Sequence, residues 1–178
     1  MRRKTKFDQT KLTQVATNKT VLGVYVDSFP IEMVKLRFAE FEGEKNSIDI
    51  YLSFEDALRI TQDIKSGKFF KDLQNSQYPI YLSRGGTVKD GQAISRAITA
   101  GMKADKVYLN AQLGPGKVID TGAILPDGQP TKKVSVGMSV DHLKGLFLYM
   151  ESGINAYMPY LIKDLVKAAE ENRQKYGE

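Results

Sequence analysis

Few residues in this chain have the types and spacing that catalysis requires. Among 178 residues there is one His and no Cys, which excludes disulfides, thiolate nucleophiles, cysteine-based zinc sites and two-histidine metal motifs. The histidine, His142, follows Asp141 in the first turn of an expected helix, where the helix dipole favours an acidic residue. No serine or cysteine nucleophile motif lies near it. We therefore expect no enzymatic activity, no metal and no cofactor.

Two further patterns resemble ligand sites without matching them. Residues 114–117 (GPGK) resemble the end of a phosphate-binding loop, but Ala111 stands where that loop needs glycine and Val118 where it needs serine or threonine. Because the segment lies between two expected strands, we predict a hairpin turn. A group of acidic residues lacks calcium-loop spacing and is predicted to be a solvated hairpin tip: Glu40, Glu42, Glu44 and Asp49.

The net charge of +5 comes from the N-terminus. Residues 1–20 contain six Lys or Arg and one Asp, whereas the remainder is neutral. A basic arm on a neutral body suits a polyanion binder, because each phosphate contact releases counterions. The alternative is a disordered, solubilising terminus. The cations of this arm that we assign to binding are Arg2, Arg3, Lys4 and Lys6.

The remaining composition is that of an ordinary globular protein, with 42% hydrophobic residues. No apolar run approaches the ~20 residues of a membrane helix, and the N-terminus has no apolar signal-peptide core. We therefore expect a cytoplasmic protein with no membrane partner. We divide it into the arm, 1–20, and one domain, 21–178.

The first half of this domain shows a strand pattern followed by a helix pattern. Strands are predicted at Val21–Asp27, Met33–Phe41 and Ile48–Ser53, the last two as a hairpin. At Ser53 the hydrophobic period changes from two to about 3.6, so this serine is predicted to cap a helix that ends near residues 66–67.

The second half repeats the order of strands and then helix. The polar segment 84–92 is expected to be a loop, and 93–102 could be strand or helix. A turn is predicted around Asp127-Gly128. Strands are expected at 78–83, 106–113, 118–125 and 133–138.

A long helix is predicted from Ser139 almost to the C-terminus. Its apolar residues recur at spacings of three and four, close to a heptad pattern. Gly153 and Pro159 predict a kink or a helix–turn–helix break. The helix could simply lie on its own sheet, but its surplus length favours self-association, so we expect a homo-oligomer.

The two points where strand changes to helix align at an offset of 86 residues. Segment 52–67 then matches 138–153 without a gap, with three identical and five similar pairs. We therefore predict an α+β fold that is a tandem repeat, each half being antiparallel strands followed by one helix, over about 21–75 and 78–178.

Cations and tyrosines alternate with the apolar side chains of the expected strands. If the apolar sides pack under the helices, these residues lie on exposed sheet faces, where phosphates can pair with Lys and Arg and unstacked bases can lie on rings. The alternative is a normal polar face in which Tyr is merely a good strand former. The predicted nucleic-acid-binding residues are Lys35, Arg37, Tyr51, Tyr81, Arg84, Lys106, Tyr108 and Lys133.

This pattern resembles the Whirly-type single-stranded DNA binders, and it is similar to PUR-repeat proteins and to the positive-cofactor-four coactivator. The resemblance covers roughly residues 21–165 and is one of topology, since the Lys-Gly-Lys-Ala-Ala-Leu signature of plant Whirly proteins is missing. It implies sequence-tolerant binding of single-stranded DNA, often by oligomers, in replication, recombination or transcription. Alternatives are an RNA-binding protein of the same fold and an oligomeric protein-interaction module. The small, Cys-free, Lys-rich chain would suit a phage or mobile element.

Overall fold

The computed structural model describes residues 10–41 and 46–176, which form two antiparallel sheets and their covering helices. The first sheet has four strands in the order β1 (Lys11–Ala16), β2 (Thr20–Tyr25), β3 (Met33–Glu40) and β4 (Ser47–Ser53). A short 3-10 helix, η1 (Phe29–Ile31), joins β2 to β3.

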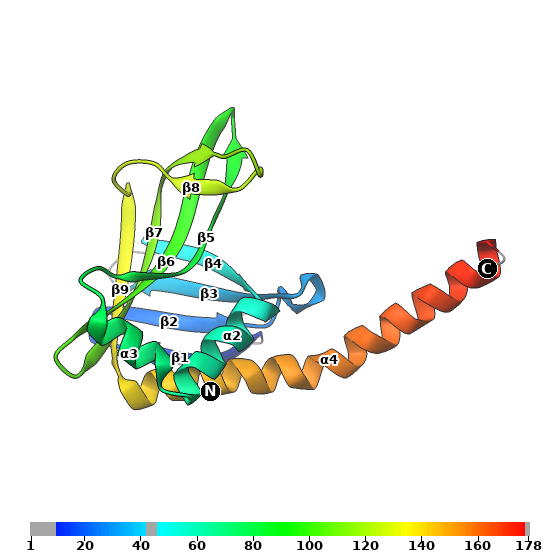
Figure 1. The fold of residues 1–178 in the computed structure, drawn as a ribbon, viewed down its shortest axis with the longest axis horizontal. Coiled ribbons are helices and arrows are strands. Elements are labelled where there is room, and N and C mark those ends of the chain that lie inside the picture. Colours follow the sequence, from blue (N-terminus) through cyan, green and yellow to red (C-terminus); the bar gives the residue numbers. More distant parts are fainter. Residues whose placement is uncertain (1–9, 42–45, 177–178) are drawn as a thin grey trace.

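The second sheet has five strands, with β7 (Lys106–Val118) as its longest member. On one side β7 pairs with β6 (Gln92–Lys103), which pairs in turn with β5 (Ile80–Lys89). On the other side it pairs with β9 (Lys132–Ser139) and, at its far end, with the three-residue β8 (Ile124–Pro126). Figure 1 shows the strands of the two sheets running in crossed directions.

Each sheet passes directly into a helix at a serine, as predicted. Ser53 Oγ accepts a hydrogen bond from the Asp56 N–H (3.0 Å) at the start of α2 (Phe54–Lys65). Ser139 Oγ accepts one from the His142 N–H (3.2 Å) at the start of α4 (Val140–Tyr176). A further helix, α3 (Lys68–Asn75), follows α2 after Gly67, whose φ of +76° favours glycine.

The α+β repeat predicted from the 86-residue offset is confirmed. The helices α2 and α4 pack against each other, and an ion pair joins Lys65 to Glu151 (2.6 Å). A hydrogen bond from Thr61 Oγ1 reaches the Phe147 carbonyl (3.5 Å). Both pairs are separated by 86 residues, so equivalent positions of the two halves meet at the helix interface.

One hydrophobic core joins both sheets to the helices. It takes the alternate residues of each central strand, such as Val34, Leu36 and Phe38 in β3, together with Phe147 and Met150 of α4. The other side of each sheet therefore points away from the core, as the period of two requires.

The predicted arm boundary is wrong. Residues 11–16 form β1 and pair with β2, and Leu12 and Val15 pack against the core. The sequence shows no clear alternation here because β1 is an edge strand, most of whose side chains are only half-buried. Arg2, Arg3, Lys4 and Lys6 lie outside the described residues.

Residues 84–126 also differ from expectation. The predicted loop 84–92 continues β5 to Lys89 and turns at Asp90-Gly91, and the ambiguous segment 93–102 is a strand. Residues 114–117 are not a turn but part of β7. Within the predicted strand 118–125, Val118 is the last residue of β7 and residues 124–125 belong to β8, whereas 119–123 are not in a strand. Most of β5 beyond Leu82 is not buried, so it lacks the alternation that marks a half-buried strand.

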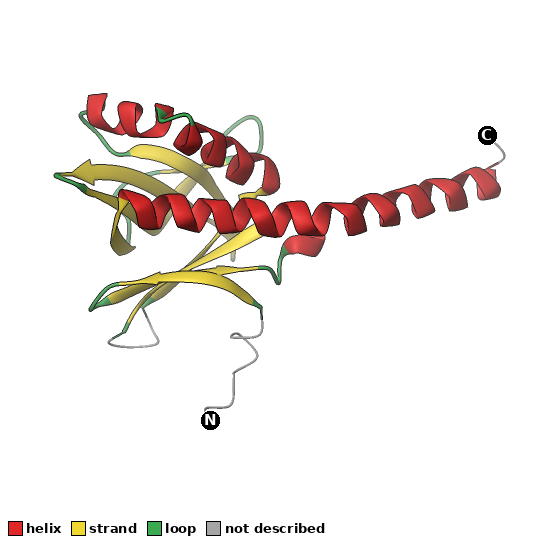
Figure 2. Ribbon diagram, turned by 90° about the horizontal axis from the view of Figure 1, so that it is seen from below, coloured by secondary structure: helices red, strands yellow, loops and turns green. Residues whose placement is uncertain are grey.

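Helix α4 runs unbroken through Gly153 and Pro159. Figures 1 and 2 show its first half against the body and its second half extending far beyond it, with a change of direction along the way in Figure 1. None of the helices in the described part of the chain is both long and apolar enough to span a membrane.

Candidate nucleic-acid interface

Five of the predicted residues lie together on the side of the second sheet that points away from the core. Their strands bury the alternate positions Val107, Leu109 and Val134, so the intervening side chains point outward. Tyr81 and Arg84 are three residues apart and would point to opposite sides of a regular strand. A bulge in β5 between Tyr81 and Ser83 shifts the register by one residue, so that both pair with outward positions of β6. We call this surface the tyrosine–cation face: Tyr81, Arg84, Lys106, Tyr108 and Lys133.

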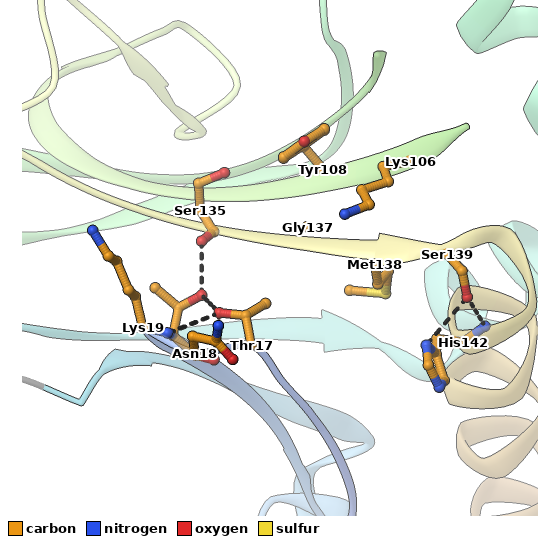
Figure 3. Close-up of a pocket in the computed structure, with 11 residues that line it drawn as sticks. Thr17, Asn18, Lys19, Lys106, Tyr108, Ser135, Gly137, Met138, Ser139 and His142 are labelled. Carbon is orange, nitrogen blue, oxygen red and sulfur yellow. Dashed lines mark hydrogen bonds between the residues drawn. The ribbon is translucent and has the colours of Figure 1, made fainter. Parts of the chain in front are cut away.

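At one end of this face lies a groove of about 800 Å³ between the β1–β2 turn and strands β7 and β9 (Figure 3). We call it the turn groove. Lys19 stands on the turn, Lys106 on β7 and His142 at the start of α4. Thr20 Oγ1 donates a hydrogen bond to the Ser135 carbonyl (3.1 Å), which fixes the turn against β9. No carboxylate lines the groove among the described residues, so its charged groups favour an anion.

The Tyr108 ring in this groove is held in place by a glycine. A Cβ added at Gly137, its cross-strand partner, would lie 2.7 Å from the ring, so the ring rests directly on the glycine backbone. Only glycine permits this close approach without moving the ring. The tyrosine is therefore positioned by the fold.

A cation–aromatic pair occupies the opposite edge of the face. The Arg84 guanidinium carbon lies 3.9 Å from the centroid of the Tyr81 ring, close enough to stack on it. Tyr81 is 44% exposed. This pair presents a planar surface and a positive charge at the same point, a combination that suits a nucleotide.

A second hollow separates Tyr81 from Lys133. It measures about 360 Å³ and lies between strands β6 and β7 and the loop that joins β8 to β9. We call it the loop cleft. Its polar side chains include Gln112 and Gln129, and no carboxylate lines it among the described residues.

The cations of the tyrosine–cation face are not neutralised by any carboxylate in the part of the chain that the structure describes. Arg84, Lys106 and Lys133 form no ion pair with a described carboxylate. Their charge is therefore available to a ligand.

Lys35 and Arg37 point outward from the first sheet, as predicted, but both are already paired. Arg37 donates from Nε and Nη2 to the two carboxylate oxygens of Asp49 (2.7 and 2.9 Å). This hydrogen bond is the main cause that raises the pKa of Arg37 above its ordinary value. Lys35 is 7% exposed and its Nζ donates to Asp27 (2.9 Å). The structure thus removes these two residues from the set of cations that can reach a phosphate.

Tyr51 lies on β4, outside the tyrosine–cation face but near its edge. It shares a separate hollow of about 340 Å³ with Arg84 and Arg96. Asp56 also lines this hollow, so its charge is mixed. Tyr51 therefore lies in a hollow next to Arg84 but is not part of the tyrosine–cation face.

Four residues that line these hollows are absent from the predicted set, for different reasons. Lys19 lies in the segment predicted to be the arm, Arg96 in the segment that could be strand or helix, and Gln129 beside the predicted turn. Gln112 lies in the predicted strand 106–113, but its polarity alone does not mark it as a binding residue.

The expected hairpin tip contains no candidate metal site in its described part. Asp49 is paired with Arg37, and Glu40 accepts a hydrogen bond from Asn46 Nδ2 (2.6 Å). Glu42 and Glu44 lie outside the described residues. Across the described ranges no three His, Asp or Glu side chains cluster as metal ligands would.

No protein-family model matches the chain, and a search of curated proteins found no match.

Proposed function

We propose that this protein binds single-stranded nucleic acid, DNA in preference to RNA, on the tyrosine–cation face and without enzymatic activity. One observation carries the proposal: three cations with no carboxylate partner among the described residues lie beside two positioned tyrosines on one sheet surface. Phosphates would contact Arg84, Lys106 and Lys133, and bases would stack on Tyr81 and Tyr108.

The spacing of the face suits a strand that crosses it. Tyr108 in the turn groove and Gln112 in the loop cleft are four residues apart on β7, which is roughly 13 Å along an extended strand. The hollows are thus successive sites along one sheet surface. Contacts of this kind depend on backbone charge and on base faces, so the binding is largely sequence-tolerant. Such a protein would act in replication, recombination or transcription.

Fluorescence anisotropy with labelled single-stranded DNA, duplex DNA and single-stranded RNA of equal length tests this proposal. We expect the tightest binding to single-stranded DNA. With three phosphate contacts, the logarithm of the binding constant should fall with the logarithm of salt concentration with a slope of about −2. Equal binding to duplex would contradict the stacking role of the tyrosines. Absence of binding at low salt would favour a protein partner for the face instead.

We also propose that the second half of α4 joins copies of this chain. Its apolar side chains Ile162, Leu165 and Val166 are all more than half exposed and recur at helical spacing. An isolated helix is marginal in water and is stabilised mainly by packing of its apolar face. A second copy of the same face would supply that packing.

Sedimentation equilibrium tests the assembly proposal. Replacing Leu165 with Gln should shift the protein toward the monomer, whereas the control Lys163→Gln, on the polar side of the helix, should leave the mass unchanged. A wild-type protein that sediments as a monomer at all concentrations would refute the proposal.

A further inference from the structure

The loop cleft has the size and shape of a site for one small ring. Its volume, about 360 Å³, is near the lower end of the roughly 300–1,000 Å³ found for small-molecule sites. Strands β6 and β7 form the floor, at Ala97 and Gln112. Residues 126–130 form one wall, and Tyr81 and Lys133 lie at other parts of the lining.

The wall of the cleft is fixed rather than loose. The Asp127 N–H donates to the Pro115 carbonyl (3.0 Å), and Thr131 Oγ1 donates to the Leu113 carbonyl (3.1 Å). Between these bonds the loop rests on Gly114, where a Cβ would lie 2.8 Å from Pro130 Cα. Both ends of the loop are therefore tied to β7, and the cleft exists before any ligand enters.

The polar groups in the cleft suit an uncharged ring that has hydrogen-bonding edges. The side-chain amides of Gln112 and Gln129 form no hydrogen bond with another described residue, so their donors and acceptors are available. The Ser95 hydroxyl donates to the Pro115 carbonyl (2.8 Å) and is already engaged. Lys133 adds a positive charge, which suits a phosphate attached to the ring.

We propose that the loop cleft holds one unpaired adenine base of the bound strand and reads its edge through Gln112 and Gln129. A carboxamide offers one donor and one acceptor side by side, which is the arrangement that pairs bidentately with adenine. The Tyr81 ring supplies a stacking surface and Lys133 contacts a neighbouring phosphate. This inference rests on the proposed function and adds a base preference to a face that is otherwise sequence-tolerant.

Competition binding separates the two proposals. Labelled oligothymidine of about 20 nucleotides is displaced by unlabelled strands of the same length in which some thymines are replaced by adenine, cytosine or guanine. We expect the adenine-containing strand to compete best, by about fivefold or more over oligothymidine. Gln112→Leu should abolish this advantage, so that the adenine-containing strand competes no better than oligothymidine in that variant.

Two further variants make the test decisive. Gln129→Ala removes the second amide from a loop residue and should reduce the adenine advantage. The control Gln74→Leu, at an exposed position of α3 that does not line the cleft, should retain the adenine advantage in full. An adenine advantage that survives both Gln112→Leu and Gln129→Ala, or no advantage in the wild type, overturns the base-reading site while single-strand binding still stands. If no strand binds at all, the proposed function itself fails.

Discussion

The Tyr81–Arg84 pair allows a direct test of the tyrosine–cation face. Replacing Tyr81 with Ala removes one stacking surface and also the ring that positions the Arg84 guanidinium at 3.9 Å. One stacked base contributes about 1–3 kcal/mol, so the dissociation constant for single-stranded DNA should rise by about 5- to 150-fold. The charge of the face is unchanged, and the salt slope should therefore stay close to the wild-type value.

Fluorescence anisotropy at two salt concentrations measures both quantities. The control is Tyr78→Ala, which removes a tyrosine that is 77% exposed and lies just before β5, lining neither the turn groove nor the loop cleft. Its affinity should match that of the wild type. Because Tyr81 is itself 44% exposed, its loss should lower the free energy of unfolding by less than about 1 kcal/mol, which urea denaturation checks.

Two results would refute this reasoning. Unchanged affinity in Tyr81→Ala would show that no base stacks at this position. An equal loss in Tyr78→Ala and Tyr81→Ala would show that aromatic residues act through a general effect on solubility or folding and not through the sheet surface.

Two other predictions concern positions that the fold holds tightly. The double variant Arg37→Met/Asp49→Asn removes a pair with no net charge, so affinity for single strands should stay within about twofold while the free energy of unfolding falls by about 1–2 kcal/mol in urea titrations. The folded-state pKa of Arg37 is raised, so the stabilisation by this pair is complete below the pKa of free arginine and is lost only as the pH rises above that value. The titration of Arg37 should therefore cause no change in the wild-type urea midpoint between neutral and mildly alkaline pH. Gly137→Ala should displace the Tyr108 ring and weaken the binding of single strands by a factor of about 5 or more. The control Gly145→Ala, where an added Cβ meets open space on α4, should bind with wild-type affinity. Equal affinities of the two variants in an anisotropy titration would contradict the positioning role of Gly137.

Much of the fold follows from hydrophobic period alone. Val34, Leu36 and Phe38 alternate with polar residues because one side of β3 is buried, and the period changes at Ser53 because a helix begins there. The same parity places Tyr108 and Lys133 on the outward side, which the structure confirms. These elements could be predicted since each buries one face against a single core.

Other elements carry no such signal. The second half of β5 is mostly exposed, and apart from Val88, which is 56% exposed, residues 84–89 are polar or glycine and suggest a loop. Residues 114–116 contain glycine and proline because neighbouring strands approach closely: a Cβ at Gly116 would lie 2.6 Å from Ile124. Glycine and proline are also typical of turns, so the sequence of this closely packed segment suggests a turn where the structure has a strand.

The availability of a cation depends on its neighbours, which sequence parity does not give. Arg37 and Asp49 are twelve residues apart, and it is the register of β3 against β4 within the predicted hairpin that makes them cross-strand partners. The 86-residue offset places Ser135 at the position equivalent to Asp49, and the cross-strand partner of Ser135 is Asn110. Ser135 Oγ donates to Asn110 Oδ1 (2.7 Å), so the second half has a neutral hydrogen bond where the first half has an ion pair.

This difference between the two halves explains why Lys35 and Arg37 of the first sheet are paired with carboxylates, whereas the cations of the tyrosine–cation face have no carboxylate partner among the described residues. In the first sheet, each of the two outward cations predicted to bind is matched by a carboxylate of the protein. In the second sheet the central pair, Ser135 and Asn110, is neutral, and no described carboxylate pairs with the cations around it; in the proposed function a phosphate would be their partner. The carboxylate of Asp49 would then prevent Arg37 from binding a phosphate. Asp49→Asn alone should remove this competition and strengthen the binding of single strands, most clearly at low salt. Unchanged affinity and an unchanged salt slope in that variant would show that the first sheet lies outside the path of the strand for reasons of shape and not of charge.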